Sequence, residues 1–499
     1  MVDVVSWGWV DGFKPFDLRH SLLCVRAGIP PAIRPAAHPG PDVSYDADMS
    51  EHGLSLATQK MVDAGVDPVA IDVFTHYYRL AETGTTGLIG EDTIEPLLAP
   101  AQLDQVEVSQ ADAQDALAKT VIIKLNGGLG TSMGLDRAKS LLPVRDGRNF
   151  LDLIAAQVLH ARRTYGVRLP LLFMDSFRTR QDTLEYLARY PELATDGLPL
   201  DFLQNAEPKI RADDLTPVEW PDDPSLEWCP PGHGDLYPAL WGSGVLDALI
   251  DAGFRYVSVA NGDNLGAAPN PRLAGWFAGT GAPYAAEVCP RTVNDRKGGH
   301  LAIRKRDGQL ILRDTAQTAP EEMHFFTDEY RHPFFHANNL WLDIVQVRQA
   351  MVARGGVLEL PLIRNLKTVD PTDRTSPQVI QFETAMGSAI EVFPGAQAIA
   401  VGRDRFLPVK TTNELMLLRS DVFDLREDGT LAAVADIPGI DLDDRYYKLV
   451  DDFDERVRVV PSLRRAESLV VRGDWVFDAP SEVVGEVALA DDGERRHYR

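Results

Sequence analysis

Cysteine, positive charge and long apolar runs are all scarce in this sequence. Its three cysteines, Cys24, Cys229 and Cys289, lie far apart and form no CxxC pair. This excludes a disulfide framework and a zinc-ligand spacing, and it is typical of the reducing cytoplasm. The formal net charge of −24 argues against nucleic acid and anionic membranes as partners, because both bind basic surfaces. The negative net charge does not exclude small anions as ligands, since a local group of lysines and arginines can make one cleft positive.

The N-terminal region lacks the features of a targeting or membrane segment. No apolar run reaches the roughly 18 to 20 residues that span a bilayer. The opening stretch, MVDVVSWGWVDGFKPFDLRH, has neither the basic start nor the apolar core of a signal peptide. A proline-rich stretch, RAGIPPAIRPAAHPGPDVS, comes next, and from Met49 the apolar residues have helical spacing instead. We expect residues 1–48 to be a disordered tail or the product of a misassigned start site, and the protein to be cytoplasmic.

The rest of the chain divides into three predicted regions. A length of 499 residues is too great for one compact core, so several domains are expected. Residues 49–118 show helical spacing, with AIDVFTHYYRLAETG and EDTIEPLLAPA as the clearest helices. Residues 119–425 alternate strands and helices, which predicts an α/β domain with a mostly parallel sheet. Residues 426–499 contain YYKLVDDFDERV, which predicts one helix, followed by Val-rich strands that predict a small β-rich domain.

Two apolar runs that end in polar residues predict buried parallel strands. They are LPLLFMDS (169–176) and FRYVSVANGDN (254–264). Parallel sheets bind ligands at the carboxyl ends of their strands, and Asp263 lies just beyond the second run. A carboxylate there can hold Mg²⁺, which prefers oxygen ligands. By itself, such an aspartate is more often a turn or capping residue.

A glycine-rich loop follows a further predicted strand in VIIKLNGGLGTSMG (121–134). Gly128, Gly130 and Gly134 give G-x-G-x-x-x-G, one residue longer than the dinucleotide fingerprint. The ATPase P-loop is excluded as well, because Leu135 rather than a lysine follows Gly134. These spacings argue against an NAD enzyme and against a kinase.

The loop can still bind phosphate in another way. Its amide groups can hold phosphate oxygens as an anion nest does, and Thr131 and Ser132 offer further donors. Lys139, a little further on, supplies a compact positive charge. On this evidence alone, a tight strand–helix turn with a surface lysine explains the segment equally well.

The residues of this loop resemble those of a known family. LNGGLGTSMG followed by Lys139-Ser140 looks like the nucleotide-binding signature of the eukaryotic-type UTP–glucose-1-phosphate uridylyltransferases (UDP-glucose pyrophosphorylases). Further segments resemble the same family, in the family's order. They are FLQNAEPKI (202–210), PPGHGDLYPALWGSG (230–244), YVSVANGDNLGA (256–267), HANNLWLDI (336–344), QVIQFETAMGSAI (378–390) and RFLPVKTTNELMLLRSD (405–421). Several independent segments of this length would hardly arise by chance.

The resemblance implies a fold and an activity. The fold is a Rossmann-like, GT-A-like mixed sheet that forms a catalytic nucleotidyltransferase domain, with a helical segment before it and a small left-handed β-helix-like domain after it. The activity is a reversible, Mg²⁺-dependent transfer of UMP from UTP to glucose 1-phosphate, which gives UDP-glucose and pyrophosphate. Formation of a homo-oligomer through the C-terminal domain is left open.

The resemblance also implies roles for individual residues. Lys139 and Lys410 are the expected catalytic residues, and Asp263 is the expected metal ligand. The expected nucleotide-binding residues are Leu125, Asn126, Gly127, Gly128, Lys139, Gln204, Gly232 and Lys410. The expected sugar-phosphate residues are His233, Asn261, Gly262, Asp263, Asn338 and Asn339. Which of Asn338 and Asn339 contacts the sugar is left open.

The chemistry of the expected reaction agrees with these residue types. A sugar phosphate is already an anionic nucleophile, so no general base is needed, and repulsion between two anions is the main obstacle. Charge neutralisation and positioning therefore carry the catalysis. Outside this context, Lys410 would be explained as a surface lysine, and His233, between Gly232 and Gly234, as an idle residue of a surface turn.

Two departures from the family leave alternatives open. Asn261-Gly262-Asp263 stands where the family usually has Asn-Ser-Asp, and His336-Ala337 replaces a more usual Asn-Thr. The sugar-side wall therefore differs, and a pyrophosphorylase for another hexose 1-phosphate, such as galactose 1-phosphate, is retained as an alternative. A catalytically inactive nucleotide-sugar sensor is a second alternative. Retention of both lysines and of Asp263 argues against it.

Overall fold

The computed structural model describes residues 47–84, 87–292, 295–296 and 298–499. Internal contacts divide the chain into residues 1–43 and 44–499, and the description below concerns the second unit. The predicted tail, residues 1–48, lies outside the described residues except for the start of α1 (Ala47–Asp63). Of the helices in the described part of the chain, none has the length and apolarity that crossing a membrane requires.

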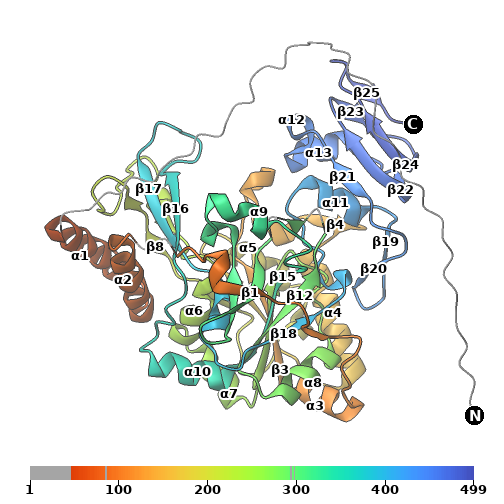
Figure 1. The fold of residues 1–499 in the computed structure, drawn as a ribbon. Coiled ribbons are helices and arrows are strands. Elements are labelled where there is room, and N and C mark those ends of the chain that lie inside the picture. Colours follow the sequence, from red (N-terminus) through yellow and green to blue (C-terminus); the bar gives the residue numbers. More distant parts are fainter. Residues whose placement is uncertain (1–46, 85–86, 293–294, 297) are drawn as a thin grey trace, which may run out of the picture. The chain divides into compact units, whose positions relative to one another are not determined.

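A mixed sheet of eight strands forms the framework of the structure (Figure 1). Its order is β2-β18-β12-β15-β11-β3-β6-β7. The strands are β2 (Ala101–Gln102), β18 (Gln397–Ala400), β12 (Tyr284–Pro290), β15 (Phe334–Asp343), β11 (Tyr256–Asn261), β3 (Thr120–Asn126), β6 (Leu171–Asp175) and β7 (Asp201–Leu203). β15 runs antiparallel to both neighbours, and every other neighbouring pair is parallel. The α/β prediction is confirmed, and so are both predicted parallel strands, which are β6 and β11.

Helices cover both faces of this sheet. Along β3, Ile122 packs into one core cluster, while Val121 and Ile123 pack into another. The first cluster includes α3 (Gln110–Ala118), α4 (Phe150–Tyr165) and α8 (Pro271–Thr280), and the second includes α6 (Leu236–Gly242), α7 (Val245–Asp251) and α10 (Ile344–Ala353). In Figure 1 the second group lies to the left of the strands and the first to the right. Because both faces are buried, the central strands are nearly continuous apolar runs.

Local sequence explains where α4 begins and ends. The side chain of Asn149 accepts a hydrogen bond from the amide of Asp152, and Asp152 accepts one from the amide of Asn149. This capping box satisfies amide groups that the first turn leaves unpaired. Gly166 ends the helix with a φ of +65°, a left-handed conformation that favours glycine. In the sequence, a helical pattern ends with glycine in RRTYG, which is typical of a helix C-terminus, and the structure confirms this prediction.

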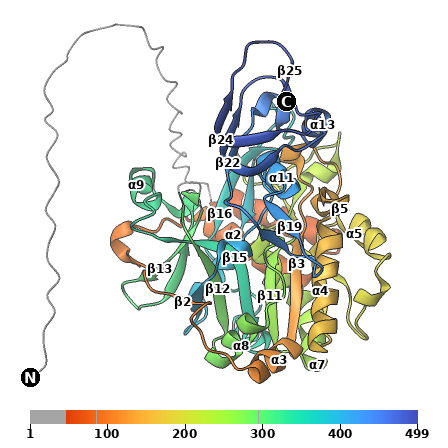
Figure 2. The ribbon, with the colours of Figure 1, turned by 90° about the vertical axis from the view of Figure 1, so that its right-hand side faces the viewer.

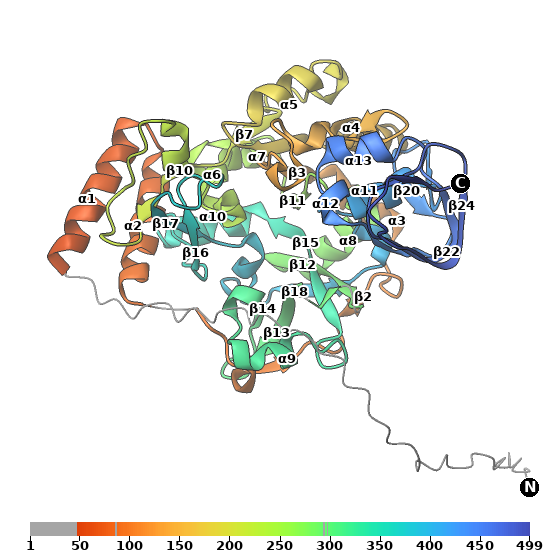
Figure 3. The same ribbon diagram turned by 90° about the horizontal axis from the view of Figure 1, so that it is seen from above.

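The helices α1 and α2 (Pro68–Glu82) pack together against a second, small sheet (Figure 3). That sheet consists of β16 (Ile363–Thr368), β17 (Gln378–Glu383) and β9 (Ile210–Arg211). Phe74 and Tyr78 of α2 share a core with Phe382 of β17. The hydroxyl of Tyr78 donates a hydrogen bond to the carbonyl of Leu215 at 2.8 Å. The helix predicted from AIDVFTHYYRLAETG is thus confirmed.

The helix predicted from EDTIEPLLAPA is wrong. Glu91–Thr93 form one 3-10 turn, and β1 (Ile94–Pro96) pairs with β13 (His300–Arg304). The strand β2 then joins the edge of the main sheet. Pro96 and Pro100 lack the amide N–H that a helix interior needs, and pairing with distant strands overrides the local pattern.

The C-terminal residues form short helices and parallel β-ladders. The single helix predicted from YYKLVDDFDERV is wrong, because α12 (Asp444–Tyr447) and α13 (Val450–Arg456) are separate. The carbonyl of Tyr447 accepts a hydrogen bond from Oγ1 of Thr412 at 2.7 Å, which withdraws it from a continuing helix. The β-rich prediction is confirmed by two parallel ladders (Figure 2). They are β21 (Gly439–Asp441), β22 (Ser462–Val471) and β24 (Glu482–Leu489), and β23 (Trp475–Val476) with β25 (Arg496–His497).

The remaining elements are short. They are β4 (Pro143–Arg145), β5 (Arg148–Asn149), α5 (Arg180–Leu187), β8 (Glu207–Pro208), β10 (Trp228–Cys229), β14 (Leu310–Arg313), α9 (Met323–Phe326), α11 (Thr412–Arg419), β19 (Phe423–Leu425) and β20 (Leu431–Ala433). Since residues 44–499 form one compact unit, the domain boundaries at residues 118 and 425 stay predictions.

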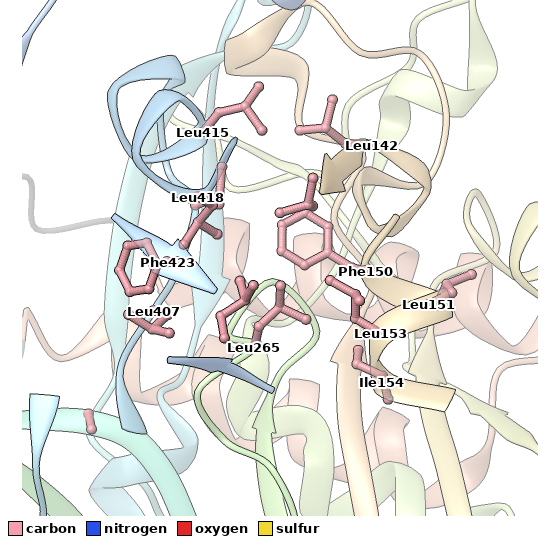
Figure 4. Packing of buried hydrophobic residues seen from close by; sticks show 14 of the residues in the cluster. Leu142, Phe150, Leu151, Leu153, Ile154, Leu265, Leu407, Leu415, Leu418 and Phe423 are labelled. Carbon is pink, nitrogen blue, oxygen red and sulfur yellow. The ribbon is translucent and has the colours of Figure 1, made fainter. Parts of the chain in front are cut away.

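An apolar core attaches α11 to the main framework (Figure 4). Phe150 and Leu153 of α4 face Leu415 and Leu418 of α11, and Leu265 lies between the two groups. All of these side chains are buried. This packing fixes the position of the chain that leads into α11, which includes Lys410.

A buried ion pair also holds the chain segment that leads through Lys410 into α11. Glu287 on β12 is fully buried, and its carboxylate accepts hydrogen bonds from Arg405 at 3.0 and 2.8 Å and from Nε1 of Trp341 at 3.0 Å. Burial by itself would raise the pKa of Glu287. The charge and hydrogen bonds of Arg405, together with the other donors, outweigh burial and lower it. The carboxylate of Glu287 therefore stays ionised inside the protein.

We expect Glu287→Gln to lower the free energy of unfolding by about 3–5 kcal/mol, because the charge of Arg405 would stay buried without its partner. The control is Asp247→Asn, which breaks an ion pair with Arg348 whose side chains are 45% and 44% exposed. That change should cost at most about 1 kcal/mol. Urea unfolding measures both values, and equal effects of the two variants would contradict the assigned role of Glu287.

Candidate functional site

The glycine-rich loop leaves β3 at the edge of the sheet where the parallel strands β6 and β11 also end. Gly130 and Gly134 have φ values of +72° and +79°, a region that glycine enters without strain. The amide of Lys139 donates a hydrogen bond to the carbonyl of Gly128 at 3.1 Å, so the chain folds back onto the loop. A Cβ at Gly128 would meet no atom within 4 Å. The backbone at Gly128 therefore borders open space that a phosphate can enter.

Three distant segments meet at the ammonium group of Lys139. Its Nζ lies 2.6 Å from Oδ2 of Asp263 and also donates a hydrogen bond to the carbonyl of Val409. A backbone bridge between Asn264 and Pro408 holds the second and third segments together. Lys410, whose side chain is exposed, directly follows the residue that Lys139 contacts. The structure thus brings together the segments of both predicted catalytic lysines and of the predicted metal ligand.

The loop around Gly262 explains one departure from the family. β11 and β3 are parallel and pair Asn261 with Leu125. The amide of Gly262 then donates a hydrogen bond to the carbonyl of Leu125 at 2.7 Å. A Cβ at Gly262 would lie 2.8 Å from that oxygen, closer than a side chain tolerates. A side chain at this position would therefore require the backbone next to Asp263 or Leu125 to shift.

Gln204 and the glycine loop form a second part of the site. A Cβ at Gly127 would lie 2.7 Å from Oε1 and 2.9 Å from Nε2 of Gln204, so the loop backbone rests on this side-chain amide. Asn126 has a different role from its neighbours. Its Nδ2 donates to Asp175 and to Thr183, at 2.8 Å each, and its side chain is buried. Protein groups therefore already occupy the Nδ2 group of Asn126.

The segment Gly232–Gly234 packs closely against Thr384. A Cβ at Gly232 would lie 2.7 Å from the carbonyl oxygen of Thr384, and one at Gly234 would lie 2.2 Å from its hydroxyl. Nδ1 of His233 accepts a hydrogen bond from the amide of Met386 at 2.9 Å. Nε2 therefore carries the proton and can donate to a ligand. His233 stays partly accessible to solvent, and desolvation by the surrounding protein lowers the pKa of its ring to about 4.

The two neighbouring asparagines of β15 have different environments. Asn339 is buried. Its Nδ2 donates to the carboxylate of Glu287 and to the backbone carbonyl of Arg405, and its Oδ1 accepts a hydrogen bond from Asn264 at 3.0 Å. Asn338 is partly exposed, has a left-handed φ of +55°, and donates to Oδ1 of Asn261 at 3.0 Å. Protein groups thus occupy the amide of Asn339, whereas Asn338 and Asn261 form a pair at the carboxyl end of β11.

The residues around Lys139 fit a magnesium ion that arrives together with a nucleotide. Within the described residues, no group of three or more His, Cys, Asp and Glu side chains could hold a metal ion by itself. Mg²⁺, however, is commonly held by one or two carboxylates together with substrate phosphates and waters. Asp263 supplies one such carboxylate at the phosphate-binding loop. In this structure Lys139 balances its charge.

The supporting residues of this site were not found from the sequence. Glu287, Arg405 and Thr384 hold the loops in place but belong to no phosphate-binding pattern. The one local signal was a glutamate inside the apolar run YAAEVCP, since a charged residue in a buried strand is normally paired. Nothing local indicated that Arg405 was its partner.

The fold and the site together define a class of protein. A phosphate-accessible glycine loop, two lysine-bearing segments and one carboxylate meet at the carboxyl ends of a mixed α/β sheet, as in enzymes that act on phosphorylated nucleotides. The family model described as UTP–glucose-1-phosphate uridylyltransferase matches residues 71–483. The chain belongs to this family.

Curated relatives and solved structures agree with the family model. The UTP–glucose-1-phosphate uridylyltransferase of Solanum tuberosum is 35% identical over 405 residues, which cover 80% of this chain and 82% of that protein. The enzyme of the same name from Saccharomyces cerevisiae is 39% identical over 385 residues, covering 76% and 75%. A mutant of UDP-glucose pyrophosphorylase from Leishmania major, solved in complex with UDP-glucose, is similar with a TM-score of 0.81 and 39% identity, covering 90% of this chain and 98% of that chain.

We expect Gly262→Ala to lower the free energy of unfolding by about 1–3 kcal/mol, because the new methyl group would overlap the carbonyl of Leu125. The control is Gly279→Ala on α8, where a Cβ would meet nothing within 4 Å. In a helix that change should stabilise by about 0.5–1 kcal/mol. Urea unfolding compares the two, and a neutral Gly262→Ala variant would contradict the close approach.

We also expect His233 to be neutral, with its proton on Nε2, throughout the range around neutral pH. The amide of Met386 occupies Nδ1, and burial lowers the pKa of the ring to about 4. Long-range ¹H–¹⁵N NMR correlations of the histidines, recorded from pH 8 down to pH 4, report the tautomer and the protonation midpoint. An imidazolium pattern for His233 at pH 6, or a proton on Nδ1, would contradict this assignment.

Proposed function

We propose that this protein catalyses the reversible transfer of UMP from UTP to glucose 1-phosphate, which gives UDP-glucose and pyrophosphate. One observation carries the proposal. Lys139, beside the glycine loop, contacts both Asp263 and the backbone that leads into Lys410. The names of the relatives, which are 35% and 39% identical over most of the chain, support the same activity.

The proposed reaction is an in-line displacement at phosphorus. An oxygen of the sugar phosphate forms a bond to the α-phosphorus of UTP, and the bond from that phosphorus to the bridging oxygen of pyrophosphate breaks. The nucleophile is ionised near neutral pH, so no protein base has to remove a proton. The protein has to hold two anions in line and offset the charge that accumulates between them.

Each charged group then has a definite part. Amides of the loop around Gly127 and Gly128 bind phosphate oxygens, and Lys139 and Lys410 neutralise the reacting phosphates. Asp263 is the proposed ligand of Mg²⁺, which would supply further positive charge at the phosphates. A carboxylate that ligates a cation no longer needs Lys139 as its partner. The ammonium group of Lys139 is then available to the substrate.

The base and the sugar bind on either side of these groups. We propose that Gln204 reads the uracil edge, since its amide can both donate and accept, and that Leu125 and Gly232 border the nucleotide. His233 donates from Nε2 to the sugar phosphate. We assign the sugar contact to Asn338 together with Asn261, because protein groups already occupy the amide of Asn339.

Finer features of the fold belong to the same proposal. The sheet is assigned to the Rossmann-like, GT-A-like type, since its parallel strands carry the site at their carboxyl ends. The C-terminal residues are assigned to a left-handed β-helix-like domain, which the parallel pairing of β21, β22 and β24 supports. A homo-oligomer through that domain and a cytoplasmic location complete the proposal. Cys229 and Cys289, both free and buried, are compatible with that location.

The proposal predicts pyrophosphate release that requires UTP, a divalent cation and a hexose 1-phosphate together. Glucose 1-phosphate should be the best acceptor in a panel that includes galactose 1-phosphate and N-acetylglucosamine 1-phosphate, with ATP, GTP and CTP as alternative nucleotides. A coupled assay for pyrophosphate measures the rates. A preference for galactose 1-phosphate would establish the hexose alternative. Tight UTP binding without release under any combination would establish an inactive sensor instead.

Loss of one phosphate-clamping lysine should slow turnover strongly. We expect Lys410→Ala to lower kcat by about 10²–10³-fold, as removal of one preorganised charge-stabilising donor does. The matched control is Lys119→Ala. Lys119 is also exposed but precedes β3, at the opposite end of that strand from the loop. Steady-state kinetics compares the two variants, and near-normal turnover of Lys410→Ala would remove this lysine from the mechanism.

A further inference from the structure

A buried carboxylate behind the site joins two of its loops. Asp235 accepts hydrogen bonds from the backbone amide of Asn205 at 2.5 Å and from the side-chain Nδ2 of Asn205 at 2.8 Å. Its side chain is 3% exposed, so water does not compete for these donors. Two donors from one residue hold that residue both in position and in orientation.

The two partners belong to different parts of the proposed site. Asn205 directly follows Gln204, whose amide lies against Gly127 of the glycine loop. Asp235 ends the 3-10 turn His233–Asp235, which carries the proposed phosphate-contacting histidine. One carboxylate therefore connects the base-reading side of the site to the sugar-phosphate side.

The turn that carries His233 is also fixed from the opposite side. The amide of Gly234 donates to the carbonyl of Thr384 at 2.8 Å, and the amide of Thr384 donates to the carbonyl of Pro231 at 3.0 Å. With the bond from Met386 to His233, these contacts hold the turn on the chain that follows β17. Asp235 then links this fixed turn to Asn205, the residue that follows Gln204.

A small cavity lies behind Asp235. Its volume is about 20 Å³, and Tyr77, Glu207, Gly234, Phe382 and Thr384 also line it. A volume of this order holds about one water molecule. Glu207 accepts a hydrogen bond from the amide of Phe382 at 3.2 Å. Beside this cavity, the two hydrogen bonds of Asp235 join the turn directly to Asn205.

We propose that Asp235 is a positioning residue that sets the placement of Gln204 relative to His233 by holding Asn205. This proposal rests on the proposed function, in which Gln204 binds the uracil of UTP and His233 binds the sugar phosphate. In-line attack requires both substrates in one geometry, and a displacement of about 1 Å can cost about 10²-fold in rate. A carboxylate that fixes the spacing of the two binding loops thus controls how the α-phosphorus faces its nucleophile.

The test compares removal of the acceptor at position 235 with its conservative replacement. Asp235→Ala removes both hydrogen bonds to Asn205. Asp235→Asn can keep both, because its carboxamide oxygen accepts from the backbone amide of Asn205 and its NH₂ group donates to the side-chain oxygen of Asn205 once that amide has turned over. Assays at pH 8 keep Asp235 mostly ionised, since burial raises its pKa to about 7.

We expect Asp235→Ala to lower kcat/KM for UTP by about 10- to 100-fold and to weaken UTP binding measured by calorimetry without sugar phosphate. Asp235→Asn should avoid most of this loss. The control Asp343→Ala affects another buried aspartate with two backbone donors, Val345 and Gln346, at the other end of the sheet. It should lower the melting temperature and leave KM unchanged.

The outcomes separate the two proposals. If Asp235→Ala lowers the melting temperature but leaves UTP binding and KM as in the unchanged protein, Asp235 is only structural and the inference fails. It also fails if Asp235→Asn loses as much activity as Asp235→Ala while it stays folded by circular dichroism. Lack of pyrophosphate release by the unchanged protein would instead contradict the proposed function.

Discussion

The buried ion pair between Glu287 and Arg405 is the contact on which the geometry of the site depends. Glu287 lies on β12, and the carbonyl of Arg405 accepts from Asn264, beyond β11, and from Asn339 of β15. One pair thus ties three strands of the main sheet to the segment that continues into Lys410. Such a pair adds little net stability to a fold, but separating its partners leaves an unpaired charge in the interior. The segment is therefore confined to one position over the sheet.

The site that this framework supports works through charge and placement. Lys139 already sits against Asp263, at 2.6 Å, in the arrangement that a phosphate or a cation would reorganise. The neutral ring of His233 contributes a hydrogen-bond donor without adding charge. Such groups suit a reaction between two anions, in which the nucleophile is already ionised and the obstacle is repulsion.

Much of the framework could be predicted because it depends on local patterns. Apolar runs predicted β6 and β11, since strands buried on both faces admit few polar residues. Glycine predicted the end of α4, where a left-handed residue is needed. The failures have equally physical causes. EDTIEPLLAPA carries apolar residues at helical spacing, but β1 and β2 satisfy their backbone groups through pairing with distant strands. At Tyr447 a hydroxyl from Thr412 takes the carbonyl that a continuing helix would have used.

By itself the sequence determined which chemical groups are present: a glycine loop too long for NAD, no P-loop, two lysines, one aspartate beyond a strand, and the residues that mark the family. Only the tertiary structure decided how they meet. In the structure, Lys139 contacts Asp263 and Val409, Asn339 is buried and bonded to protein groups, and Asn205 is hydrogen-bonded to Asp235. The reason is that chain patterns record local preferences of the backbone. Which buried carboxylate meets which donor depends on strand order and loop closure across hundreds of residues.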